Sequence, residues 1–211
     1  MSVTAIIPVR SLSDGKTRLA SVLDGAERYT LNARFLVHTL RTAGALTGNT
    51  VVVTRCLEAR EIANASGACS LFETTRGGLN PALQSASKIA RARGAARILI
   101  LPADLPFVCL DDLRALIWHA GRAGAAIAPD QPRDGTNALC LPAGHSFRFR
   151  FGTRSFFRHQ READKVGLEM AVVRRPSLAF DVDRPNDFSQ LKVLEDDNHG
   201  TNFTSGLHSI R

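Results

Sequence analysis

An aspartate between two prolines is the feature of this chain that most clearly suggests chemistry. The segment LILPADLP, residues 99–106, places Asp104 between Pro102 and Pro106. A continuous apolar run is typical of a buried parallel strand, and open α/β sheets bind ligands at the carboxyl ends of such strands. A carboxylate fixed there suits a divalent cation. The alternative is that Asp104 caps a helix that begins near Leu110.

A basic loop follows the first apolar run of the chain. Residues 8–19 read PVRSLSDGKTRL. The backbone amides of a tight loop, together with Lys16 and Arg18, could cradle a triphosphate. The GKT tail is similar to the end of a Walker A loop, but that motif needs a glycine where this chain has Arg10, so we reject a P-loop. The alternative is an ordinary solvated loop.

Paired glycines precede a predicted helix in the segment TRGGLNPAL, residues 75–83. Gly77 and Gly78 would let the backbone come close to a flat ligand such as a base or a ribose. The alternative is a plain turn in which Asn80 is the N-cap and Pro81 is the first helical residue. The two interpretations are compatible.

Hydroxyl and amide donors gather in two later segments. The segment RDGTNAL, residues 133–139, contains Thr136, and FGTRSF, residues 151–156, contains Gly152 and Ser155. Such donors suit a phosphate or a carboxylate, and a helix that begins at Ser155 would add its N-terminal partial positive charge. We therefore predict an anion site here.

Two carboxylates lie two residues apart in FDVDRP, residues 180–185. At the end of a short strand, Asp181 and Asp183 would point to one face. The alternative for Asp183 is an N-cap ahead of Pro185.

Apolar periodicity predicts alternating strands and helices. We predict strands over residues 3–9, 51–53, 70–72, 97–101, 125–128, 138–141 and 170–173, and helices over residues 27–45, 57–65, 80–93, 110–123, 155–163 and 185–194. Repeated β-α-β units imply an α/β fold whose sheet is mostly parallel, with helices on both faces. Residues 1–195 are predicted to form a single domain, and the polar residues 196–211 a mobile tail.

The composition narrows the classes of partner. The 211 residues carry a formal charge of +7, which favours anionic partners. Aromatic residues make up only 6%, and the arginines are scattered, so small anions are favoured over nucleic acid. The chain has no apolar run long enough to span a membrane, and its first residues lead us to expect no signal peptide. Four cysteines without zinc-site spacing are expected to be mostly core thiols of a cytoplasmic protein.

Taken together and in order, these segments resemble one family. IPVR…GKTRL, GGLNPAL, LPADLP, GTNAL, FG-x-x-SF-x-RH and DVDRP are similar to the phospholactate guanylyltransferase family of coenzyme F420 biosynthesis. The resemblance spans about residues 3–194. It implies a GT-A-like nucleotidyltransferase fold and a reaction in which GTP and a phosphorylated three-carbon acid give a guanylylated acid and pyrophosphate. The acid would be 2-phospho-L-lactate, phosphoenolpyruvate or 3-phospho-D-glycerate.

The resemblance also implies roles for individual residues. Asp104, with Asp181 or Asp183, would hold Mg²⁺, and Lys16 would contact the GTP phosphates. The implied catalytic residues are Lys16 and Asp104. The implied nucleotide-binding set is Arg10, Lys16, Arg18, Gly77, Gly78, Asn80 and Pro102, and the implied acceptor-binding set is Thr136, Gly152 and Ser155.

The chain departs from the family pattern at two places. Arg10 stands where a lysine is common, and Thr153-Arg154 replaces a Pro-Gly pair. The second change would add a bulky cation beside the acceptor site, which leaves the acceptor's identity open.

The expected chemistry needs no general base, because an acceptor phosphate is largely ionised at neutral pH. Electrostatic neutralisation and positioning would suffice. The histidines, His159 among them, are interpreted as packing or surface residues. Two alternatives remain: a nucleotidyltransferase for another phosphorylated acceptor, and a non-catalytic nucleotide- or RNA-binding module. The sequence leaves a homodimer open.

Overall fold

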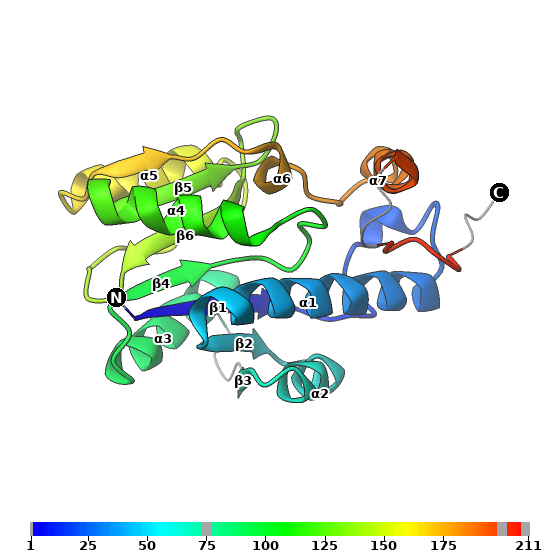
Figure 1. The fold of residues 1–211 in the computed structure, drawn as a ribbon, viewed down its shortest axis with the longest axis horizontal. Helices are drawn as coiled ribbons and strands as arrows, with labels where there is room; N and C mark the ends of the chain where they lie inside the picture. Colours follow the sequence, from blue (N-terminus) through cyan, green and yellow to red (C-terminus); the bar gives the residue numbers. More distant parts are fainter. Residues whose placement is uncertain (1, 73–76, 198–201, 208–211) are drawn as a thin grey trace.

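The computed structural model describes residues 2–72, 77–197 and 202–207. Its centre is a seven-stranded sheet in the order β3-β2-β1-β4-β6-β5-β7 (Figure 1). The strands are β1 (Val3–Val9), β2 (Thr50–Thr54), β3 (Cys69–Phe72), β4 (Arg97–Ile100), β5 (Ala125–Pro129), β6 (Thr136–Pro142) and β7 (Met170–Val172). Among these strands only β6 runs antiparallel to its neighbours, β4 and β5. The predicted mostly parallel α/β sheet is confirmed.

Helices cover both faces of the sheet. They are η1 (Thr17–Leu19), α1 (Gly25–Thr47), α2 (Leu57–Ala65), α3 (Leu79–Ala92), α4 (Leu110–Ala123), α5 (Ser155–Lys165), α6 (Pro176–Ala179) and α7 (Pro185–Asp197). Buried residues of α1, α2, α4 and α6 share one hydrophobic cluster, and those of α3 and α5 share another. None of the described helices is both long and apolar enough to cross a membrane.

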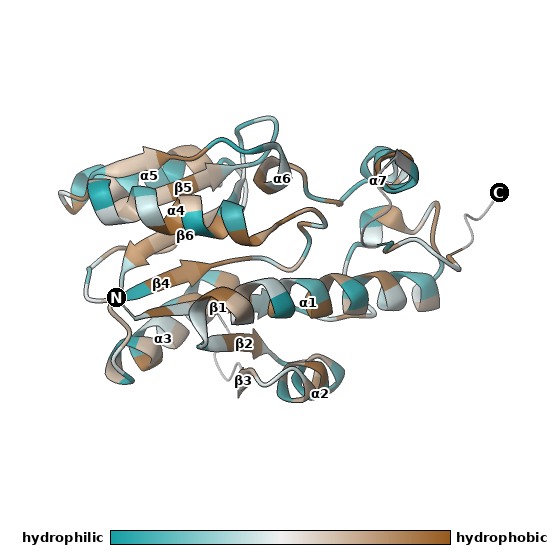
Figure 2. Ribbon diagram, in the orientation of Figure 1, coloured by the Kyte–Doolittle hydropathy of each residue, from teal (hydrophilic) through white to brown (hydrophobic). Residues whose placement is uncertain are grey.

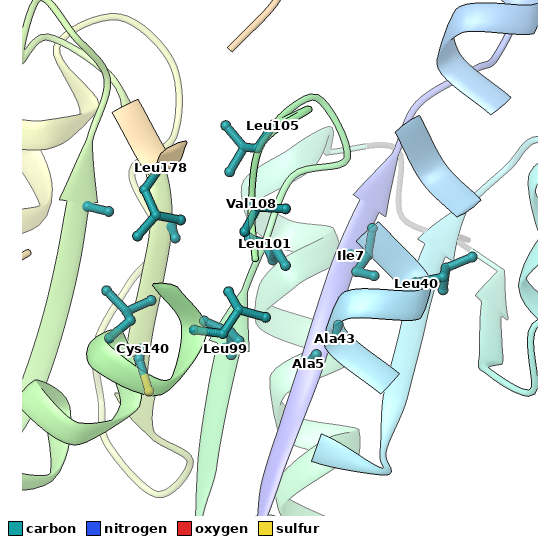
Figure 3. Packing of buried hydrophobic residues seen from close by; sticks show 14 of the residues in the cluster. Ala5, Ile7, Leu40, Ala43, Leu99, Leu101, Leu105, Val108, Cys140 and Leu178 are labelled. Carbon is teal, nitrogen blue, oxygen red and sulfur yellow. The ribbon is translucent and has the colours of Figure 1, made fainter. Parts of the chain in front are cut away.

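The core explains why the strands carry continuous apolar runs. Leu99 on β4 is fully buried between β1 and β6, opposite Ala5 and Cys140 (Figure 3). Figure 2 shows hydrophobic colours along β4 and alternating colours along α1, as expected for a strand buried on both faces and a helix that is half exposed. This packing fixes the carboxyl end of β4, from which residues 101–106 emerge.

A third cluster lies beyond the sheet and includes the chain's last described segment. Phe203 is 1% exposed and packs edge-on against Phe35 of α1, with ring centroids 5.0 Å apart. The carboxylate of Glu195 on α7 accepts hydrogen bonds from the backbone nitrogens of Phe203 and Thr204. Residues 202–207 therefore pack against the domain, and the mobility predicted for residues 196–211 stays a prediction. Residues 198–201 and 208–211 lie outside the described residues.

Several helix starts differ from their predicted caps. The helix at residue 110 is capped by Cys109, so Asp104 does not cap it. Helix α3 begins at Leu79 with Gly78 as its N-cap, so Asn80 is not the N-cap and Pro81 is not the first helical residue. Gly78 has φ 80°, a backbone conformation that glycine adopts without strain.

The predicted burial of the cysteines also needs correction. We expected most cysteines to be core residues, but only Cys140 is buried. Cys69 and Cys109 are exposed and Cys56 is half-buried, and all four are free. Short side chains at strand and helix ends give no periodic signal of burial, which is why the sequence did not distinguish them.

Candidate functional site

The basic loop after β1 returns to the sheet through Lys16. Its backbone is left-handed, with φ 54°, and its side chain is 8% exposed. The ammonium Nζ lies 3.5 Å from Asp104 Oδ2 and donates a hydrogen bond to the carbonyl of Val182. It also lies over the Phe35 ring, 5.6 Å from the centroid. A strained backbone that directs a buried cation at a carboxylate is the kind of feature that functional sites retain.

Asp104 and Asp181 converge at the carboxyl edge of the sheet. The backbone nitrogen of Val182 donates to the carbonyl of Asp104 at 3.2 Å, which fixes the two segments together. Burial, then repulsion from the Asp104 carboxylate, raises the pKa of Asp181 to about 6. Asn137 Nδ2 donates to Asp181 Oδ1 at 3.2 Å, and Lys16 partly offsets the repulsion. Lys16, Asp104 and Asp181 therefore form one electrostatic cluster.

Asp183 has different partners. Its carboxylate pairs with Arg18, which is largely exposed. Its backbone nitrogen, and that of Arg184, donate to the carboxylate of Asp187, so Asp187 satisfies the amides ahead of α7. The predicted N-cap role of Asp183 is therefore wrong. Of the two candidate carboxylates, Asp181 is the one whose charge is coupled to Asp104.

The donor set fits a magnesium ion in type and number. Mg²⁺ is commonly held by one or two carboxylates, with waters and substrate phosphates completing the octahedron. Burial first, and repulsion from Asp104 second, raise the pKa of Asp181, and a cation held by these residues would offset both effects. In the described residues there is no group of three or more ligating side chains. The candidate pair is Asp104 and Asp181.

The other predicted nucleotide-binding residues occupy the same edge of the sheet. Arg10 is exposed directly after β1, and Pro102 is half-buried after β4, which pairs with β1 in parallel. Gly77 and Gly78 are exposed at the start of α3. A Cβ on Gly77 would lie 2.7 Å from Pro81, so this backbone approach needs glycine. Residues 73–76 of the predicted loop lie outside the described residues.

Asn80 has a structural role that its sequence position did not indicate. Its Nδ2 donates to the carbonyl of Phe151 at 3.1 Å, and its Oδ1 accepts from the backbone nitrogen of Phe151 at 2.8 Å. Asn80 thus holds the extended segment before Gly152 against α3. This pair of bonds links the predicted nucleotide loop to the predicted acceptor segment.

Two predicted acceptor residues meet in a buried hydroxyl pair. Ser155 Oγ and Thr136 Oγ1 are 3.2 Å apart, and the residues are 2% and 7% exposed. Thr136 Oγ1 also lies 3.0 Å from His159 Nδ1. The two hydroxyls come from β6 and α5, which are far apart in sequence.

Gly152 and Arg154 shape the turn that leads to Ser155. Gly152 has φ 116° and Arg154 has φ 56°. The Arg154 guanidinium lies over the ring of Phe157, 5.7 Å from its centroid, and Phe157 is exposed. The Arg154 side chain packs along the exposed side of α5, and its expected place beside the acceptor stays a prediction.

The start of α5 is already partly neutralised by Asp134. The backbone nitrogen of Arg154 donates to Asp134 Oδ2 at 3.1 Å, and that of Phe156 donates to the Asp134 carbonyl at 3.0 Å. The nitrogen of Ser155 donates to Gly152. These amides are therefore used within the protein, and the hydroxyls are the polar groups that remain for a ligand.

Three residues of this region were missed from the sequence. Asn137 bonds Asp181, and Asp130 contributes to raising the pKa of Asp181. His159 is fully buried and bonds Thr136. The motifs GTNAL and SF-x-RH contain Asn137 and His159, so the signal was present, but their partners come from distant segments.

Two cavities open in the described part of the chain. One, of about 500 Å³, lies between α3 and residues 145–150 and is bordered by Asn80 and Arg150. The other, of about 760 Å³, lies between residues 129–133 and helices α6 and α7 and is bordered by Asp130 and Phe180. Asn80 is thus a predicted site residue that borders a cavity, whereas Lys16, Asp104 and Asp181 border neither of these two.

The sheet topology and this carboxylate edge define a nucleotidyltransferase fold. A solved structure described as a nucleotide-diphospho-sugar transferase of Desulfovibrio desulfuricans superposes with a TM-score of 0.74, over 97% of this chain and 91% of that one. The sequence identity is 17%, so this similarity concerns the fold. A family model described as guanylyl transferase CofC like matches residues 3–210, and the chain belongs to this family.

Characterised relatives differ in the acid for which they are named. The phosphoenolpyruvate guanylyltransferase of Rubrobacter xylanophilus is 39% identical over 92% of this chain and 95% of its own length. The 3-phospho-D-glycerate guanylyltransferase of Phenylobacterium zucineum is 36% identical, over 87% and 86%. The 2-phospho-L-lactate guanylyltransferase of Methanothermobacter thermautotrophicus is 32% identical, over 98% and 92%. The predicted family is confirmed, and the alternative functions are not favoured.

Proposed function

We propose that this protein transfers GMP from GTP to the phosphate of a phosphorylated three-carbon acid and releases pyrophosphate, with Mg²⁺ as its cofactor. The observation that carries the proposal is the convergence of Lys16, Asp104 and Asp181 at one edge of the sheet. The relatives named as guanylyltransferases support GTP as the donor. The product would be an intermediate of coenzyme F420 synthesis.

The transfer is a substitution at the α-phosphorus. An oxygen of the acceptor phosphate forms a bond to the α-phosphorus, and the bond from that phosphorus to the β-phosphate bridging oxygen breaks. The acceptor phosphate is already ionised near pH 7, so no proton needs to be removed. The main obstacle is repulsion between two anions, which positioning and positive charge can overcome.

Lys16 is suited to this electrostatic role. Its ammonium is held by the Val182 carbonyl and faces Asp104, so it does not need to be reoriented when charge develops on the leaving pyrophosphate. Magnesium bound by Asp104 and Asp181 would supply further neutralisation of phosphate charge. Removal of either carboxylate would leave the incoming phosphates with less compensation.

The acceptor is proposed to bind at the Thr136–Ser155 hydroxyl pair. These groups are buried, and Gly152 provides an open backbone beside them. We test phosphoenolpyruvate first because a 39% identical relative is named for it. The free thiols support the further expectation of a reducing cytoplasm.

The deciding experiment measures pyrophosphate release from GTP and Mg²⁺ with phosphoenolpyruvate, 3-phospho-D-glycerate and 2-phospho-L-lactate in parallel. Reactions without acceptor, and with ATP or CTP in place of GTP, are the controls. Release with at least one acid and GTP is expected, and the acid that gives the highest kcat/KM identifies the acceptor. Absence of release with all three acids, while GTP still binds, would overturn the proposal.

A further inference from the structure

His159 is buried among aromatic rings, yet both of its ring nitrogens have polar partners. It is fully buried on α5, with the Phe151 ring 4.7 Å away between centroids. The backbone nitrogen of Arg150 lies 2.9 Å from Nε2, and Thr136 Oγ1 lies 3.0 Å from Nδ1. The imidazole therefore bridges an extended backbone segment and one hydroxyl of the proposed acceptor site.

These contacts assign the protons of the imidazole. A backbone N–H can only donate, so Nε2 must accept and carries no proton. The neutral ring then carries its proton on Nδ1 and donates it to Thr136 Oγ1. Burial lowers the pKa of His159 to about 3, and the nearby guanidinium groups of Arg158 and Arg150 act in the same direction. Arg150 is itself paired with Glu162.

The position of the proton on His159 determines whether the hydroxyl pair can donate a hydrogen bond to a ligand. Thr136 and Ser155 together have two hydroxyl protons, and one of them is used between the two oxygens, which are 3.2 Å apart. Because the Thr136 oxygen already accepts from His159, the second proton cannot be directed to the imidazole. Within the described residues this proton has no hydrogen-bond acceptor, so it is available to a ligand.

We propose that His159 is a positioning residue that makes the Thr136–Ser155 pair a hydrogen-bond donor toward the acceptor. Such a pair selects an unprotonated, anionic oxygen, either a carboxylate or a phosphate oxygen of the acid, and disfavours a group that must donate. The idea rests on the proposed function, because it deepens the acceptor site of that reaction.

Two substitutions separate the two hydrogen bonds of the imidazole. In His159→Asn the side-chain amide nitrogen can occupy the place of Nδ1 and still donate to Thr136. In His159→Gln the side-chain oxygen can occupy the place of Nε2 and still accept from Arg150, but the donor to Thr136 is lost. We expect the KM of the acid to rise at least about tenfold in His159→Gln, the effect of weakening a hydrogen bond to a charged group.

In His159→Asn we expect the KM of the acid to rise about threefold or less. The KM for GTP should be unchanged in both variants. His119→Gln, a half-buried histidine on α4, is the matched control and should leave all constants unchanged. A purely structural role would instead change both variants alike, or change the KM for GTP as much as that for the acid, and either result would overturn the proposal.

A double-mutant cycle with Thr136→Val tests the connection directly. Without the hydroxyl, His159→Gln should cause no further rise in the KM of the acid. Additive effects of the two substitutions would contradict the proposal.

A spectroscopic measurement on the wild-type protein is independent of turnover. The ¹⁵N chemical shifts of the His159 ring should show the proton on Nδ1 at neutral pH, whereas a proton on Nε2 would overturn the assignment. If no acid supports pyrophosphate release, calorimetric binding of the acid still compares the variants. Weaker binding to His159→Gln than to His159→Asn would then support the inference although the proposed function had failed, and equal binding would refute it.

Discussion

Two clusters of polar side chains lie at the same edge of the sheet and differ in charge: a carboxylate cluster (Asp104 and Asp181) and a hydroxyl cluster (Thr136 and Ser155, with His159). Burial and the neighbouring Asp104 carboxylate together raise the pKa of Asp181 to about 6. Thr136, Ser155 and His159 form a neutral network in which each oxygen and nitrogen has a partner. A bound cation would stabilise the first cluster, whereas the second is already organised.

The two clusters should respond to pH in opposite directions. The native pKa of Asp181, about 6, lies above the ordinary value of 3.8, so the native state binds more protons and this group lowers stability as pH rises from about 4 to about 6. The native pKa of His159, about 3, lies below 6.5, so the native state binds fewer protons and this group lowers stability as pH falls from about 6.5 towards 3.

The largest expected effect comes from the carboxylate cluster. Asp104→Asn removes a charge that faces Lys16 and Asp181, and we expect kcat/KM to fall about 10²–10³-fold, the range seen when one electrostatic partner of a transition state is lost. Pyrophosphate release measures it. Asp111→Asn, at an exposed aspartate that pairs with Arg114, is the control and should keep wild-type turnover. Equal activity of the two variants would remove Asp104 from the site.

A smaller effect, confined to one substrate, is expected from the hydroxyl cluster. Thr136→Val keeps the side-chain shape and removes the oxygen that bonds His159 and Ser155. The KM of the acid should rise about 10–100-fold, while the KM for GTP stays within about twofold. Steady-state kinetics with each substrate varied in turn gives both constants. If the two KM values rose together, the hydroxyl cluster would not bind the acid separately from GTP.

The carboxylate cluster should also carry a measurable cost in stability. Asp181→Asn removes the like-charge repulsion and can keep the hydrogen bond from Asn137. In metal-free buffer at pH 8 we expect the free energy of unfolding to rise by about 1–2 kcal/mol, and the difference to vanish below pH 4. Denaturant unfolding at the two pH values measures it. A stabilisation that did not depend on pH would have another cause.

The smallest effect is expected at the turn beside the hydroxyls. Arg154 is left-handed with φ 56°, so Arg154→Gly should relieve strain and raise stability by about 0.5–1 kcal/mol. Because the guanidinium packs on Phe157, the ranking of the three acids should not change. Thr153→Gly, at a position without a positive φ, should not stabilise the protein. A changed acid preference in Arg154→Gly would place this side chain in the acceptor site after all.

Local patterns predicted the elements well because each element is set by nearby residues. The strand over residues 3–9 and the helix over residues 110–123 were predicted with the bounds that the structure shows. The caps were less accurate: at α3 the residue that precedes the helix is Gly78, while Asn80 bonds Phe151 instead. A side chain that can cap a helix can equally bond a distant backbone, and the local sequence does not distinguish these outcomes.

The tail illustrates the same limit. Residues 196–211 look polar, and that composition alone suggests disorder, but a single Phe203 docks on Phe35 and His38. The Phe203 ring, the carboxylate of Glu195 and the guanidinium of Arg34, which donates to the carbonyls of Phe203 and Ser205, together hold residues 202–207 on α1 and α7. The composition describes the average polarity of the segment, whereas its packing depends on individual side chains and on the surface that they contact.

The sequence by itself determined the alternating strands and helices, the family, and the segments that supply the proposed chemistry. Hydrophobic periodicity and motif spacing are local properties, so they can be recognised in the sequence without a structure. The tertiary structure alone decided which groups meet: that the charge of Asp181 is coupled to Asp104, that Asn80 bonds Phe151, and that His159 bonds Thr136. Charge coupling and hydrogen bonding act over a few ångströms, so they depend on contacts between segments that are distant in the chain.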